Sequence, residues 1–248
     1  MIHSTPRQDD IIAHATYPTI RSAYQSFETT FVFFHPFLKI NPGFKIAFET
    51  NNWPTKKEII SCTENITWAD IIQRAGLQDN SELDRLLAYL HCARRIADRE
   101  GWIKLMTLVD QNNFICAQVD ILPETLINPL MSAIRTLGYS TVQEFDQMGD
   151  LRKLHTIDGI LLNENWDFVS YARVQTPDNK LVIDTEFDAR FSYLSGSKEM
   201  VKFIIEQANL EGFYCTETTR SGWSHKEQTE NVIDWDSAER NKRQTKLS

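Results

Sequence analysis

The sequence predicts an α+β fold, an antiparallel or mixed sheet with several packed helices in a single compact unit. Between residues 166 and 194, apolar and polar residues alternate with period two around turn-forming residues, which is typical of hairpins. Between residues 83 and 97, leucine and alanine recur at helical spacing. The regular strand–helix alternation of a doubly wound sheet is missing. The chain has 248 residues, of which 42% are hydrophobic, so it is long enough to bury a sizeable core.

The first half of the chain alternates extended and helical signals. Residues 31–38 (FVFFHPFL) are aromatic and predict a buried strand or extended segment, followed by a turn at 41–43. Thr67-Trp68-Ala69-Asp70 predicts a capped short helix ending near Gly76. A longer helix capped by Asn80 or Ser81 is expected to end at Gly101.

The middle of the chain predicts two strands and then a helix. Residues 102–109 and 114–119 read as strands around a turn at 110–113. Pro123 begins a helix that Gly138 ends, although Pro129 lies inside it. The mixed pattern of residues 139–165 does not predict one element clearly. Its acidic residues fit a short helix between loops.

The last third predicts a hairpin, a helix and a closing strand. Residues 166–174 and 180–187 form the hairpin, and 189–194 extend it as a third strand. Ser195 or Ser197 caps a helix through about Leu210, and 212–216 form a final strand.

Three regions are expected. Residues 1–16 form a polar arm, 17–223 the α+β globular domain, and 224–248 a mobile charged tail. The tail holds five basic and five acidic residues, so the net charge of −8 belongs to the rest of the chain. Trp223 and Trp235 would be candidates for docking if they were exposed.

Composition excludes several common functions. Only nine glycines are present, and no two are closer than ten residues, which removes the Walker A loop, the dinucleotide fingerprint and the serine nucleophile elbow. The four cysteines are widely separated, so a structural zinc site of common spacing is not expected. A pI near 5.3 argues against nucleic acid as a partner.

The compartment follows from the first residues and the apolar runs. No basic start followed by an apolar stretch is present, and no run approaches the ~20 apolar residues that cross a bilayer. We therefore expect a cytoplasmic protein with no membrane association and with reduced cysteines.

The sharpest candidate site is the segment Asp184-Thr185-Glu186-Phe187-Asp188. In a strand, Asp184, Glu186 and Asp188 project from the same face. Three carboxylates repel one another unless a cation offsets them, and Mg²⁺ and Mn²⁺ prefer such oxygen ligands. A metal held there could activate water for phosphoester hydrolysis, with help from His155 or Asp158 if the fold brings them close. The favoured interpretation is nevertheless the solvent face of a half-exposed antiparallel strand.

Several segments resemble an uncharacterised protein family, a domain of unknown function of Bacillus and related bacteria. The matching segments are 33–37 (FFHPF), 67–70 (TWAD), 189–194 (ARFSYL), 197–199 (SKE) and 209–216 (NLEGFYCT). The resemblance covers most of residues 20–223. Because the family carries no assigned activity, it implies a bacterial, cytoplasmic, single-unit protein and transfers no functional residue.

The sequence therefore favours a non-catalytic binding or regulatory module whose partner is a protein or a small ligand. An acidic chain of this kind suits a basic partner. The alternative is a metal-dependent, phosphoesterase-like hydrolase that uses Mg²⁺ or Mn²⁺ at Asp184, Glu186 and Asp188. No catalytic residue is assigned and no cofactor is expected for the first function. The oligomeric state is not determined by the sequence.

Overall fold

The computed structural model describes residues 19–48, 53–88, 98–116, 118–146, 148–186 and 189–219. These residues form eight helices and ten strands. The helices are α1 (Ile20–Ala23), α2 (Lys56–Cys62), α3 (Trp68–Ala75), α4 (Asn80–Ala88), α5 (Arg99–Asn112), α6 (Glu124–Thr136), α7 (Ile157–Leu162) and α8 (Lys198–Ala208). The strands are β1 (Thr29–Phe34), β2 (Phe37–Ile40), β3 (Thr63–Ile66), β4 (Phe114–Ile115), β5 (Thr141–Phe145), β6 (Leu151–Thr156), β7 (Arg173–Gln175), β8 (Val182–Thr185), β9 (Phe191–Gly196) and β10 (Gly212–Tyr214). The predicted arm 1–16 and tail 224–248 lie outside the described residues.

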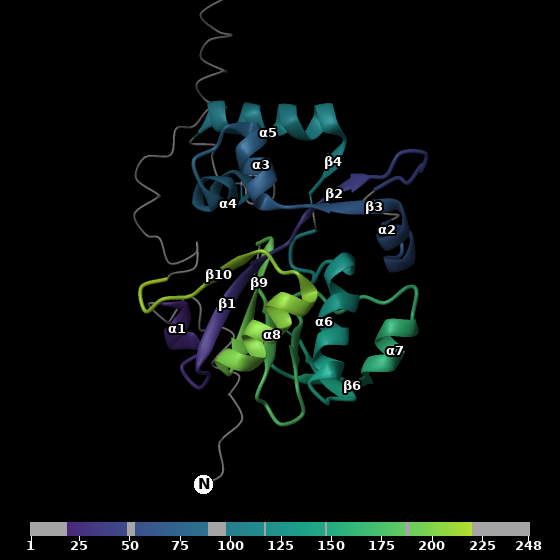
Figure 1. Cartoon of the computed structure of the whole chain (residues 1–248), viewed down its shortest axis with the longest axis vertical. Coiled ribbons are helices and arrows are strands. Elements are labelled where there is room, and N and C mark those ends of the chain that lie inside the picture. Colours follow the sequence, from purple (N-terminus) through teal and green to yellow (C-terminus); the bar gives the residue numbers. More distant parts are fainter. Residues whose placement is uncertain are drawn as a thin grey trace, which may run out of the picture.

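Two antiparallel sheets organise the molecule and confirm the predicted α+β class. The large sheet has the strand order β10-β1-β9-β8-β7-β5-β6, and the small sheet has the order β3-β2-β4. His35 and Pro36 separate β1 from β2, so one nearly continuous extended segment leads from the large sheet into the small one (Figure 1). Pro36 cannot donate a ladder hydrogen bond, which is consistent with a break at this point.

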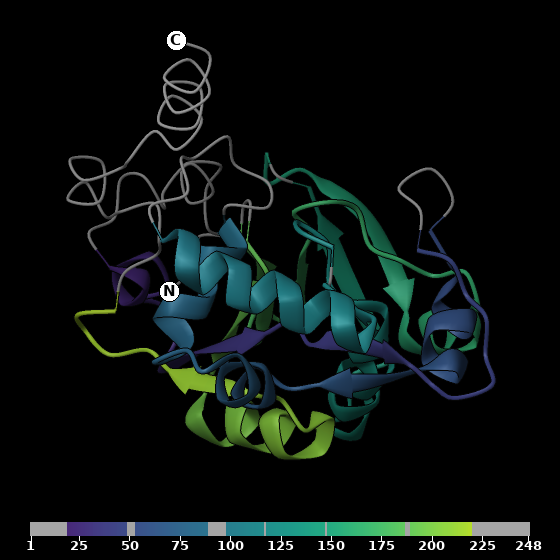
Figure 2. The ribbon, with the colours of Figure 1, turned by 90° about the horizontal axis from the view of Figure 1, so that it is seen from above.

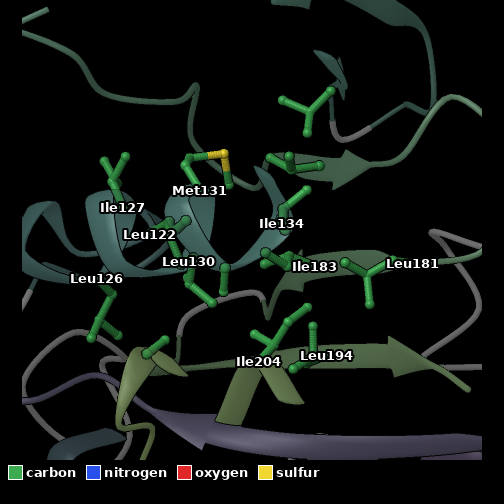
Figure 3. Packing of buried hydrophobic residues seen from close by; sticks show 14 of the residues in the cluster. Leu122, Leu126, Ile127, Leu130, Met131, Ile134, Leu181, Ile183, Leu194 and Ile204 are labelled. Carbon is green, nitrogen blue, oxygen red and sulfur yellow. The ribbon is translucent and has the colours of Figure 1, made fainter. Parts of the chain in front are cut away.

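Helices cover the two faces of the large sheet and create two apolar cores. On the first face, α6, α7 and α8 pack against Phe33, Ile183 and Leu194. Figure 3 shows Leu130 and Ile134 of α6 lying close to Ile183 of β8, with Leu194 and Ile204 below them. On the second face, α1, α3, α4 and α5 pack against β1 and β9. Figure 2 looks onto this side of the molecule and shows α5 in front, and α5 packs against α3 and α4.

Local signals explain why α3 and α8 form where the sequence predicts them. Thr67 accepts a hydrogen bond from the backbone N–H of Asp70, and Gly76 ends α3 in the left-handed conformation with φ 66°. Trp68 is fully buried and stacks on Phe34 with ring centroids 4.2 Å apart. Ser197 caps α8 by accepting from the N–H of Met200.

The prediction for residues 98–113 is wrong. Gly101 does not end a helix but lies in the first turn of α5, and 102–109 are helical instead of extended. Asp98 accepts a hydrogen bond from the N–H of Gly101 and so begins a new helix there. Leu105 and Val109 are buried one helical turn apart. Other apolar residues lie between them, so this helical spacing is difficult to recognise in the sequence. Among the described residues of the predicted strand 114–119, only those of β4 are in a strand.

The region 139–165 also differs from the expectation of a short helix carrying its acidic residues. Glu144 lies in β5, and the acidic residues Asp146 and Asp150 lie in the turn that leads to β6. Among the described residues of this region, the helix is α7, which follows β6. The second strand of the hairpin, the third strand and the closing strand are confirmed as β8, β9 and β10, each shorter than or offset from its predicted range. Of the predicted first strand 166–174, only residues 173–174 are extended, at the start of β7.

Candidate functional site

Asp184, the first predicted site residue, is buried beneath the second face of the large sheet. The register pairs Asp184 with Tyr193 of β9 and Arg173 of β7, while Ile183 faces the first core. All four residues of β8 are buried. The favoured expectation of a half-exposed strand is therefore wrong, because the residues of β8 are buried on both faces of the sheet.

The Asp184 carboxylate is held by two donors. Arg173 donates to Asp184 Oδ2 from Nε at 3.0 Å and from Nη2 at 2.6 Å, and both side chains of the pair are 12% exposed. The Tyr24 hydroxyl donates to the same oxygen at 2.8 Å. Tyr24 follows α1, so this bond ties the start of the described chain to the centre of the sheet.

Glu186 continues the polar row just past the end of β8. It is 2% exposed, and its Oε2 accepts a hydrogen bond from the Tyr193 hydroxyl. The rings of Tyr193 and Tyr24 lie 5.5 Å apart, so the two carboxylate contacts belong to one buried group. We call Tyr24, Arg173, Asp184, Glu186 and Tyr193 the central polar cluster.

Burial keeps both tyrosines of the central polar cluster protonated. Burial is the largest cause that raises the pKa of Tyr24, followed by the charge of Asp184. The pKa of Tyr193 is raised by burial and then by Glu186. Both hydroxyls therefore remain neutral hydrogen-bond donors near pH 7 and are not bases.

The third predicted site residue, Asp188, lies outside the described residues. Within the described ranges, no group of three or more His, Cys, Asp or Glu side chains is arranged to hold a metal ion. Asp184 and Glu186 do lie on one face as predicted, but the guanidinium of Arg173 already contacts Asp184. A cation would have to compete with this internal positive charge.

His155 and Asp158 do not join this cluster. Two strands, β7 and β5, separate β6 from β8 in the sheet. His155 Nε2 instead lies 2.6 Å from Glu144 Oε2, and Glu144 Oε1 accepts from the N–H of Val169 at 2.8 Å. Asp158 is exposed and pairs with Arg135 at 2.8 Å.

The buried Glu144–His155 pair was missed by sequence reasoning. The two residues are eleven apart in the sequence and are diagonal neighbours in the β5–β6 hairpin, because His155 pairs with Val142, two residues before Glu144. The signal that could have found them is the alternation of Val142 and Glu144, which predicts a strand. Nearby, Glu124 accepts from Trp53 Nε1 at 2.7 Å, and burial raises the pKa of its carboxyl.

A second polar group surrounds His35 at the junction of the two sheets. His35 Nε2 lies 2.8 Å from Ser192 Oγ, and Arg190 donates to the backbone carbonyl of Leu87 at 3.2 Å. Burial, and then the charge of Arg190, lower the pKa of His35 to about 3. His35 is therefore neutral at pH 7.

The two thiols whose pKa values are shifted are also unreactive at neutral pH. Burial raises the pKa of Cys116, and it raises the pKa of Cys215 to about 12. Since the thiolate is the nucleophilic form of cysteine, neither side chain is activated at neutral pH.

Comparison with known proteins identifies one family. The model of the family described as "Protein of unknown function (DUF2711)" matches residues 16–225. No curated protein and no solved structure matches the chain. No helix among the described residues is long and apolar enough to cross a membrane.

Proposed function

Because this chain belongs to the DUF2711 family, whose function is unknown, we propose from its own residues that it is a non-catalytic binding or regulatory protein. The observation that carries this proposal is the state of its buried polar groups. Tyr24, Tyr193 and Arg173 are donors committed to carboxylates, and His35 is held neutral next to Ser192. Groups of this kind stabilise a fold and do not transfer protons near pH 7.

The alternative is the metal-dependent hydrolase centred on Asp184, Glu186 and Asp188. Its support is that two of the three carboxylates lie on one buried face, next to each other in the same row. Against it stands the Arg173 guanidinium, which supplies the positive charge that a metal would otherwise provide.

A thermal unfolding experiment with divalent ions separates these two functions. We expect millimolar Mn²⁺ or Mg²⁺ to leave the Tm of the full chain unchanged, because Arg173 already neutralises Asp184. A bound ion at a hundred times its Kd would add about 2.7 kcal/mol of stability. That gain would raise the Tm by roughly 5–10 °C in a chain of this size.

The control is Asp184→Asn, measured with and without the same ions. A rise in Tm that Asp184→Asn abolishes would overturn the proposal and establish the hydrolase as the better hypothesis. A rise that persists in Asp184→Asn would place ion binding elsewhere on the chain and would overturn the hydrolase centred on Asp184.

A further inference from the structure

We draw no further inference here: the strongest candidate, the side-chain cluster formed by Glu124 of α6, Glu144 of β5 and Asp167 of the loop between α7 and β7, carries none, because acidic residues alone do not define a site and no second feature among the described residues points to a ligand there.

Discussion

Replacing Asp184 with asparagine is expected to lower the free energy of unfolding by about 3–5 kcal/mol. The substitution keeps the size of the side chain but removes the charge that Arg173 contacts at 2.6 Å. Because both side chains of the pair are only 12% exposed, the guanidinium would remain buried without a counter-charge. Urea unfolding of the two proteins at pH 7 measures the difference.

The matched control is Asp158→Asn. Asp158 pairs with Arg135 at 2.8 Å, a comparable distance, but the two side chains are 72% and 53% exposed. Exposed pairs of this kind contribute about 0–1 kcal/mol, so this variant should remain close to the wild type. Similar losses in both variants would contradict the claim that burial makes the Asp184 pair important.

Acidification is expected to destabilise the protein through His35. The pKa of His35 is about 3 in the folded chain against 6.5 without burial, so the unfolded chain binds a proton that the folded chain does not. The stabilising contribution of neutral His35 is complete above about pH 6.5 and is lost as the pH falls toward 3. At pH 4.5 the loss amounts to about 2–3 kcal/mol.

The measurement compares the pH dependence of unfolding in the wild type and in His35→Gln. Between pH 6.5 and 4.5 the wild type should lose about 2–3 kcal/mol more than the variant, whatever the variant's stability at pH 7. Between pH 7 and 8 the two curves should run parallel. Parallel curves over the whole range would show that His35 is not held neutral by burial.

Local signals in the sequence were sufficient for several elements. Thr67 and Gly76 bound α3 because a hydroxyl cap and a left-handed glycine act within one helix turn. The same holds for Ser197 at the start of α8. The β7–β8–β9 meander was predictable because each strand pairs with the next one along the chain.

The failures have an equally specific cause. At Gly101, a residue that commonly ends helices lies one turn after the cap Asp98, and the cap determines the outcome. In 139–165, the acidic residue Glu144 lies in β5, which pairs with β6 on one side and with β7 on the other, and its carboxylate contacts His155. The first failure is a local cap that was overlooked, whereas the second depends on strands that pair only in the folded sheet.

The candidate site was also predictable only in part. Strand periodicity alone placed Asp184 and Glu186 on one face, since side chains of a strand alternate. Periodicity cannot tell what lies over that face. Tyr24 is 160 residues away from Asp184 in the sequence and reaches it only in the folded chain.

The sequence by itself determined the α+β class, the family and the alternation that puts two carboxylates side by side, because these depend on neighbouring residues. The tertiary structure decided that those carboxylates are buried against Arg173 and two tyrosines, and that β6 lies at one edge of the large sheet. The physical reason is that burial and strand order arise from contacts between distant segments, and those contacts exist only once the sheet has assembled.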